Sequence, residues 1–309
     1  MGSAKLGITK DRLKGNYGDR HFQFMPRFKF RDKIDLVENT ILDGWLPKSG
    51  FINKDTKITA FGSCFASNIS KSLNDDGYTV LSNYSDSIKD LQKKNSYIIN
   101  FNAEMNTSFA VLQQFQWAFE NKKFSKNLWL DENGEFVGYA DDIRKETRDI
   151  FYNTDVFVIT FGLSEVWFNK ITDEVLWRAV PKRHYNSKIH GFRVSTCSEN
   201  IENIDKIYSI IKKNRPDAKI IFTLSPIPLK ATFRPVSCVT ANCVSKSILR
   251  SAIDEIYRRY ELDDNLYYWP SYEIIKELFT NPFRDTDNRH PEDQYIDIIM
   301  SLFKNYYCI

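Results

Sequence analysis

The sequence contains no long apolar run. No stretch of its 309 residues approaches the ~20 consecutive apolar residues that a membrane-spanning helix requires. The first residues are polar, and no apolar core of the kind found in signal peptides follows their charged side chains. We therefore expect a protein without a membrane span and without a cleaved signal.

Cysteine and histidine are scarce. The five cysteines are odd in number and lack CxxC spacing, so neither a disulfide framework nor a zinc site is predicted. We expect no metal site, and a reducing, cytoplasmic location is the simplest interpretation. With four histidines in the chain, each can be considered separately as a candidate for catalysis.

The sequence also lacks a strong charge of one sign. Its net charge is +3, and Lys and Arg form no continuous stripe, so nucleic acid is not an expected partner. We interpret short basic clusters such as 182–183 and 212–213 as solvated surface. Aromatic residues, at 15%, are abundant instead and favour a well-filled core. A groove lined with rings, as in many carbohydrate sites, is the alternative.

Patterns typical of strands and helices alternate through most of the chain. Residues 1–50 are polar and aromatic with little periodicity, and we expect them to form an extended arm packed on a domain of residues 51–309. Apolar runs predict strands at 57–61, 78–81, 155–161, 219–224 and 266–269. Amphipathic spacing predicts helices at 66–75, 107–120, 198–213, 242–260 and 292–306, the second with Asn106 or Thr107 as its N-cap. This order predicts an α/β fold with a parallel sheet covered on both faces, in which ligands bind beyond the carboxyl ends of the strands.

The turn after the first predicted strand carries a small nucleophile. Gly62 permits a tight turn, and Ser63 and Cys64 follow it at the start of a helix. The partial positive charge of a helix N-terminus stabilises an alkoxide or a thiolate. The turn therefore suits a catalytic nucleophile, or else its small residues merely fit the space.

Two further strand ends carry polar residues. Gly162 would let the backbone approach a ligand, Ser164 could donate a hydrogen bond to an oxyanion, and Glu165 could orient a neighbour or pair with arginine. An ordinary loop is the alternative. The connection 225–238 could form a wall of the site, where Arg234 and Lys246 would bind an anionic substrate or would simply be surface cations.

Asp287 and His290 stand together ahead of the last predicted helix. His290 is a candidate general base, and Asp287 could fix its tautomer at the spacing that a catalytic triad uses. We interpret His21 as structural. His184 and His190 lie in the segment after Trp177, where either could line a pocket.

Together these segments resemble the GSCFA family, which is related to the SGNH (GDSL-type) hydrolases. The resemblance spans roughly residues 27–305 and is carried by FGSCFASNI at 61–69, TFGLSEVW at 160–167, SPIPLKATFRPVSCVTAN at 225–242, SKSILR at 245–250, PSYEII at 270–275 and DNRHP at 287–291. It implies a flavodoxin-like three-layer sandwich with a five-stranded parallel sheet.

The resemblance also implies roles for single residues. Gly62-Ser63-Cys64 stands where SGNH enzymes carry Gly-Asp-Ser, which places Cys64 at the nucleophile position and leaves Ser63 as the competing nucleophile. Ser164 replaces the usual oxyanion asparagine, and Asn83 stands where relatives use a backbone glycine. Asp287 and His290 match the terminal block without change.

The implied function is acyl chemistry on a carbohydrate. A cysteine nucleophile would form a thioester, which water or a sugar hydroxyl could then receive. We expect an acyl-ester hydrolase or acyltransferase of bacterial surface polysaccharide assembly, without metal or organic cofactor. The alternatives are a catalytically silent glycan-binding module and the transfer of a phosphorus-containing group, for which Arg234, Lys246 and Arg289 would hold the anion.

Overall fold

A parallel sheet of four strands forms the centre of the molecule. The computed structural model describes residues 13–26, 28–84, 105–125 and 141–309. The strands are β3 (Ile58–Gly62), β4 (Val156–Phe161), β7 (Lys219–Leu224) and β8 (Leu266–Trp269), paired in this order and all parallel. The strands are almost entirely buried because both of their faces are apolar, as the sequence predicted.

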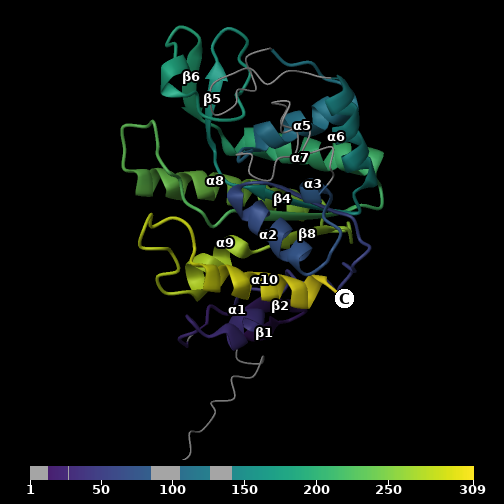
Figure 1. The fold of residues 1–309 in the computed structure, drawn as a ribbon. Helices are drawn as coiled ribbons and strands as arrows, with labels where there is room; N and C mark the ends of the chain where they lie inside the picture. Colours follow the sequence, from purple (N-terminus) through teal and green to yellow (C-terminus); the bar gives the residue numbers. More distant parts are fainter. Residues whose placement is uncertain (1–12, 27, 85–104, 126–140) are drawn as a thin grey trace, which may run out of the picture.

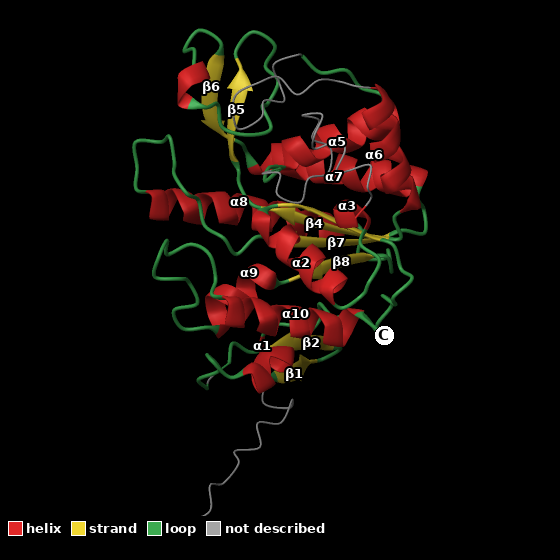
Figure 2. Ribbon diagram, in the orientation of Figure 1, coloured by secondary structure: helices red, strands yellow, loops and turns green. Residues whose placement is uncertain are grey.

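Helices cover both faces of this sheet (Figures 1 and 2). One face packs against α5 (Ser108–Glu120), α6 (Asp141–Asn153), α7 (Cys197–Asn214) and α8 (Cys238–Arg259). The other face packs against α2 (Cys64–Asp75), the single π-helical turn at Ile274–Leu278 and α10 (Asp293–Tyr307). The described residues therefore form a three-layer α/β arrangement, as predicted.

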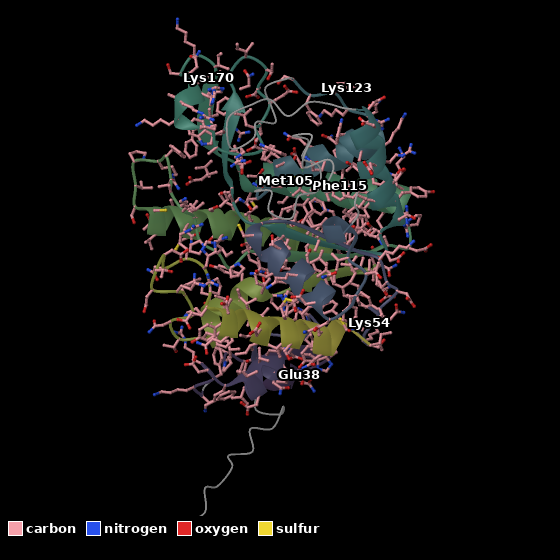
Figure 3. The ribbon with its side chains drawn as sticks, viewed as in Figure 1. Glu38, Lys54, Met105, Phe115, Lys123 and Lys170 are labelled. Carbon is pink, nitrogen blue, oxygen red and sulfur yellow. The ribbon has the colours of Figure 1, made fainter. Side chains whose placement is uncertain are left out.

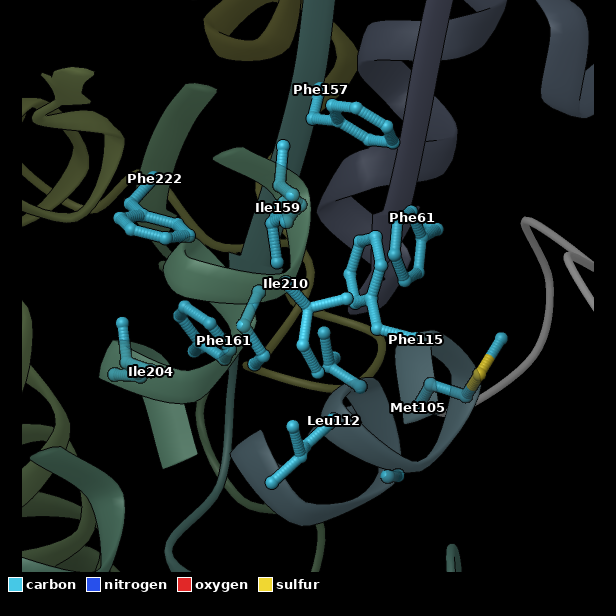
Figure 4. Packing of buried hydrophobic residues seen from close by; sticks show 14 of the residues in the cluster. Phe61, Met105, Leu112, Phe115, Phe157, Ile159, Phe161, Ile204, Ile210 and Phe222 are labelled. Atoms are coloured by element: carbon cyan, nitrogen blue, oxygen red, sulfur yellow. The ribbon is translucent and has the colours of Figure 1, made fainter. Parts of the chain in front are cut away.

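The alternation of side chains along the strands separates two cores. Phe157, Ile159 and Phe161 of β4 enter one cluster, whereas Val156 and Val158 enter the other. In the first cluster the rings of Phe61 and Phe157 face Phe115 of α5 (Figure 4). These clusters fix the strands and hence the turns that follow them.

The predicted five-stranded sheet is wrong for the described residues. The expected strand at 78–81 is reduced to one parallel bridge between Ile58 and Val80. The Ile58 N–H donates to the Thr79 carbonyl, after which α3 (Leu81–Tyr84) begins at once. Because the chain turns into a helix after a single paired residue, it forms no fifth strand.

Two antiparallel hairpins accompany the sheet. β1 (Lys14–Tyr17) and β2 (Arg20–Gln23) precede a 3-10 turn (Ile34–Leu36) and α1 (Val37–Thr40), where Val37 belongs to the second core. β5 (Glu165–Asn169) and β6 (His190–Val194) form the second hairpin, which stands beyond the sheet at the upper left of Figure 1. The sequence did not predict either hairpin. A 3-10 turn (Lys182–His184) precedes β6, and α9 (Ser271–Glu273) follows β8.

Parallel pairing places the carboxyl ends of the four strands along one edge of the sheet, which we call the carboxyl edge. Gly62 pairs with Thr160, Thr160 with Thr223, and Thr223 with Trp269. Among the helices formed by described residues, none has the length and apolar content needed to cross a membrane. The same part of the chain contains no group of three His, Cys, Asp or Glu side chains arranged to hold a metal ion.

Candidate active site

Gly62 ends β3 in a conformation that other residues rarely adopt. Its φ is +122°, and a Cβ at this position would lie 2.1 Å from the Thr160 carbonyl oxygen of the neighbouring strand. The next N–H, that of Ser63, donates to the same oxygen at 3.0 Å. Because Gly62 has no side chain, the turn can pack directly against the backbone of β4. The tight turn predicted from the sequence is therefore observed.

Ser63 and Cys64 occupy different positions in this turn. Ser63 is the N-cap of α2, with 4% of its surface exposed, and its Oγ accepts a hydrogen bond from the Phe65 N–H at 3.2 Å. Cys64 is the first residue of α2 and is exposed, with a thiol side chain. Ser63 thus has a structural role as the helix cap, whereas Cys64 is exposed to solvent at the positive end of the helix.

Asn106 lies beside the turn, although the sequence indicated it only as a possible helix cap. Thr107 is the N-cap of α5, and the Asn106 carbonyl accepts hydrogen bonds from the N–H groups of Gly162 at 2.7 Å and Leu163 at 3.1 Å. A Cβ built on Gly162 would lie 3.4 Å from the Asn106 Cβ and 3.5 Å from the Ser63 Cβ. The Asn106 Oδ1 is buried without a hydrogen-bond partner in the described part of the chain. Asn106 and the turn Gly62-Ser63-Cys64, which we call the nucleophile turn after its predicted role, therefore both lie next to Gly162.

Ser164 lies in the interior. It is fully buried, its N–H donates to the Ser245 Oγ at 2.8 Å, and its carbonyl accepts from the Ser195 N–H and Oγ, both at 2.7 Å. Its own Oγ is buried without a partner among the described residues. The backbone of Ser164 is thus fixed by two neighbouring segments, and its role as an oxyanion donor stays a prediction.

The other predicted binding residues lie in four separate segments of the chain. Glu165 is buried, and its carboxylate accepts from the Thr232 hydroxyl at 2.8 and 2.9 Å. The Arg234 N–H donates to the same hydroxyl, and Arg183 donates to the His184 Nε2 at 2.9 Å. Asn83 falls within α3, and its side chain lies outside the described residues.

Asp287 and His290 form the predicted pair. The Asp287 Oδ2 hydrogen-bonds the His290 Nδ1, and its Oδ1 accepts from the N–H groups of Arg289 at 2.9 Å and His290 at 3.0 Å. These three hydrogen bonds, the one to the His290 ring first, hold the pKa of Asp287 well below its usual range. The carboxylate therefore stays ionised and fixes the imidazole with Nδ1 as the donor.

Lys246 contradicts both expectations made from the sequence. It is neither a surface cation nor available to an anionic substrate, because only 2% of it is exposed. Its Nζ donates to the carbonyls of Gly162 at 2.9 Å, Ser225 at 2.8 Å and Ile227 at 2.8 Å, and burial lowers its pKa to about 7. The lysine thus ties the end of β4 to the segment after β7. The sequence contained one indication that Lys246 is buried, because Lys246 shares a helix face with the apolar residues Leu249 and Ile253.

Hydrogen bonds link several of the segments that carry the predicted site residues. Gly62 ends β3, Gly162 follows the neighbouring strand β4, and Lys246 links Gly162 to the segment after β7. Arg289 donates to the Pro228 carbonyl of that segment at 3.2 and 3.1 Å, which anchors the turn that carries Asp287 and His290. A proton transfer between Cys64 and His290 stays a prediction.

Several solved structures show partial similarity to the chain. One is the periplasmic domain of a lipopolysaccharide acetyltransferase from Salmonella ser. Paratyphi A, with 12% identity and a TM-score of 0.38 over 81% of this chain and 83% of that one. A GDSL-like lipase from Bacteroides thetaiotaomicron has 13% identity and a TM-score of 0.38 over 81% and 86% of the two chains. A family 3 carbohydrate esterase from Clostridium thermocellum has 10% identity and a TM-score of 0.36 over 82% and 95%.

These identities and TM-scores are too low to transfer an activity, and no curated protein matches the sequence. The family comparison is decisive instead. The GSCFA family matches residues 57–303. This range includes all four strands of the sheet, the nucleophile turn and the Asp287–His290 pair. The chain belongs to the GSCFA family.

Proposed function

We propose that this protein is an acyl-ester hydrolase or acyltransferase that acts on a carbohydrate, with Cys64 as its nucleophile. One observation carries the choice of Cys64. Ser63 is buried as the cap of α2, whereas Cys64 is exposed at the first position of the same helix, directly after β3. We place the reaction in bacterial surface polysaccharide assembly, in a reducing cytoplasm that fits five cysteines carrying thiols.

The reaction proceeds in two steps. The His290 Nε2 takes the proton from the Cys64 Sγ while Asp287 accepts a hydrogen bond from Nδ1–H and stabilises the imidazolium. The thiolate attacks the acyl carbon, and the leaving oxygen receives the proton from His290 as the thioester forms. Water or a sugar hydroxyl, deprotonated by His290, then attacks the thioester and releases Cys64. No metal or organic cofactor takes part in these steps.

The oxyanion of each step needs donors near the turn. We assign this role to the backbone N–H of residue 64 and to the side-chain amide of Asn106, which borders Ser63 and Gly162. Ser164 is the less favourable candidate because it is fully buried and its N–H is already bound to Ser245, whereas Asn106 is half-buried. Loss of one such donor costs roughly 3–4 kcal/mol of transition-state stabilisation in serine hydrolases.

The test compares single variants in acyl release and acyl transfer. Acetylated oligosaccharides and a chromogenic acetate ester serve as donors for the wild type, Cys64→Ala, Ser63→Ala and His290→Ala. We expect Cys64→Ala and His290→Ala to lose about a thousandfold or more in kcat. Ser63→Ala should retain activity and lose about 1 kcal/mol of stability as a missing cap. Full activity of His290→Ala, or loss of chemistry in Ser63→Ala alone, would contradict the assignment.

Asn106→Ala tests the second donor. We expect a fall in kcat of about a hundredfold with little change in KM, because an oxyanion donor acts mainly in the transition state. Asn203→Ala is a suitable control, since Asn203 also supplies a side-chain amide but binds Ser108 between α5 and α7. An unchanged kcat in Asn106→Ala would remove this residue from the oxyanion site.

A glycan-binding module without catalysis is the second candidate, favoured by an aromatic cavity beside the β5–β6 hairpin. Labelling with iodoacetamide separates the two functions. A catalytic Cys64 paired with His290 should react at least about tenfold faster in the wild type than in His290→Ala. Equal and slow labelling of both proteins would favour the module.

A further inference from the structure

A cavity of about 680 Å³ lies between the β5–β6 hairpin and the loop 225–237. Its volume falls within the range of small-molecule sites. Five aromatic residues and two lysines contribute to its walls: Trp167, Phe168, Tyr185, Phe192, Phe233, Lys170 and Lys182. None of them belongs to the nucleophile turn or to the Asp287–His290 pair. The cavity is therefore a second candidate site with its own chemistry.

The rings of the cavity are inclined to one another. Trp167 makes angles of 80° with Tyr185, 59° with Phe192 and 83° with Phe233, and Phe192 and Phe233 meet at 57°. A flat base is best held between parallel rings, which these contacts do not provide. A sugar ring has several apolar C–H patches in different directions, and it can pack such patches on ring faces that are inclined. The ring geometry thus favours a sugar over a nucleobase.

The surroundings of the cavity carry an excess of positive charge. The hairpin and its connection, residues 165–194, carry six Lys or Arg against Glu165, Asp173 and Glu174, so this segment alone has a net charge of +3, equal to that of the whole chain. The loop 225–237 adds Lys230 and Arg234 and contains no acidic residue. Figure 3 shows many nitrogen-tipped side chains around β5 and β6, with Lys170 at their outer end. The positive net charge of the protein is therefore concentrated around the cavity, which favours an anionic ligand.

Some of these cations form no ion pair among the described residues. Arg193 forms a bidentate pair with Glu199, at 2.9 and 2.7 Å. In the described part of the chain, no ion pair involves Lys182, Lys230 or Arg234. Lys170 donates to the Ser187 carbonyl, a neutral acceptor that leaves its charge in place. The cavity therefore presents unpaired positive charge to whatever enters it.

His190 adds a neutral donor to the wall. It is 9% exposed, its Nδ1 accepts from the Asn186 N–H at 3.1 Å, and burial lowers its pKa. The proton of the neutral ring therefore lies on Nε2, where it can be donated to a hydroxyl or carboxylate oxygen. The prediction that His184 or His190 lines the pocket of the catalytic site stays a prediction, because this cavity is a second candidate site.

The cavity is linked to the candidate active site through the loop 225–237. Phe233 follows Thr232, whose hydroxyl binds the Glu165 carboxylate at the start of β5. The same loop holds Arg289 at the Pro228 carbonyl, next to His290. The loop that carries Phe233 is thus tied both to the start of β5 and to the turn that carries His290.

We propose that this cavity binds an acidic sugar unit of the carbohydrate acceptor. The sugar ring packs against Trp167 and Phe233, and its carboxylate lies near Lys182. The identification of this sugar as part of the acceptor rests on the proposed function, but the binding itself does not require catalysis.

The test is equilibrium binding to the full chain carrying Cys64→Ala. The probes are oligosaccharides that contain glucuronic or galacturonic acid and the same oligosaccharides with their carboxyl groups reduced to alcohols. We expect the acidic forms to bind at least about tenfold more tightly than the reduced forms, and to quench tryptophan fluorescence. Equal binding of both forms, or no binding of any acidic form at millimolar concentration, would overturn the proposal.

Matched variants locate the site. Lys182→Glu should weaken binding of the acidic probes about tenfold, and Tyr185→Ala about fivefold. Lys213→Glu and Tyr152→Ala are the controls, because these residues are exposed on α7 and α6, away from the cavity. Tyr152 is 58% exposed and Tyr185 50%, so both substitutions remove a ring of similar exposure. Weakening by the control variants to the same degree would place the binding elsewhere.

The outcome separates this inference from the proposed function. If the acidic probes bind as expected but the wild type releases and transfers no acyl group, the cavity stands and the proposed chemistry falls. If the wild type acts on a small acetate ester but Lys182→Glu leaves binding of the acidic probes unchanged, the chemistry stands and the cavity proposal falls. An adenine nucleotide that displaces the acidic probes and binds more tightly would also overturn the proposal.

Discussion

The nucleophile turn and the β5–β6 hairpin lie at the same end of the sheet but are built in different ways. The turn follows a buried strand and is held by backbone groups: the φ of +122° at Gly62 and the hydrogen bond from the Ser63 N–H to Thr160. The hairpin cavity is formed by exposed or half-buried rings that come from separate segments, including Phe233 at 57% exposure. The proposed chemistry thus depends on a rigid frame, formed by the buried strands and the backbone hydrogen bonds of the turn. The proposed sugar specificity depends instead on side chains that can change at little cost in stability.

Gly62→Ala should lower the free energy of unfolding most, because it disrupts the frame that holds the nucleophile turn. Its Cβ would meet the Thr160 carbonyl oxygen at 2.1 Å in a backbone conformation that alanine rarely adopts. We expect a loss of about 4 kcal/mol in the free energy of unfolding, measured by urea denaturation. Gly77→Ala is the control, since its φ is +78° and nothing lies within 4 Å of its Cβ. It should lose only about 1 kcal/mol, and equal losses would mean that close packing at Gly62 does not matter.

Lys246→Met should also destabilise the frame. The substitution leaves the carbonyls of Gly162, Ser225 and Ile227 buried without their donor. We expect a loss of about 3 kcal/mol in the free energy of unfolding. Lys213→Met, at an exposed position of α7, should change stability by less than about 0.5 kcal/mol. A stable Lys246→Met protein would show that the frame does not need this link.

Asp287→Asn probes the exposed turn that completes the site. The pKa of Asp287 is held below its usual value of 3.8 by hydrogen bonds from His290 and Arg289. The carboxylate therefore contributes stability that is present above about pH 4 and is lost as the pH falls through its lowered pKa. We expect the wild type to exceed Asp287→Asn in urea midpoint at pH 7 and 5, with the difference shrinking towards pH 2. A difference that is constant with pH would contradict this account.

Phe233→Ala should have the smallest effect on stability. The ring is 57% exposed and lies over the cavity, so its removal should change the free energy of unfolding by less than about 0.5 kcal/mol. Binding of acidic oligosaccharides should fall in the same variant. A loss of stability close to that of Gly62→Ala would show that the cavity rings belong to the frame.

The frame was predictable because its signals are local. The strand predicted at 219–224 is observed as Lys219–Leu224, and the one predicted at 155–161 as Val156–Phe161, since runs that are apolar on both faces indicate buried strands. Thr107 and Gly62 were predicted at a helix start and a tight turn from their own chemistry. The expected strand at 78–81 was wrong because one bridge at Val80 is followed directly by α3.

The cavity and the buried lysine were not predictable in the same way. β5 and β6 pair across the intervening segment 170–189, so their register depends on contacts between distant residues. The three carbonyls around Lys246 come from two separate segments, and no spacing in the sequence shows that they converge. The sequence indicated Asn106 as a possible helix cap. Its position near Ser63 depends on tertiary packing, because both residues lie next to Gly162.

The central claim is that Cys64, rather than Ser63, attacks the acyl group. The most direct measurement is to quench the wild-type protein at acid pH during reaction with an acetate ester and to locate the acetyl group by peptide mass spectrometry. We predict an acetyl thioester on Cys64, present in Ser63→Ala and sensitive to hydroxylamine at neutral pH. An acetyl group on Ser63, retained in Cys64→Ala, would contradict the account.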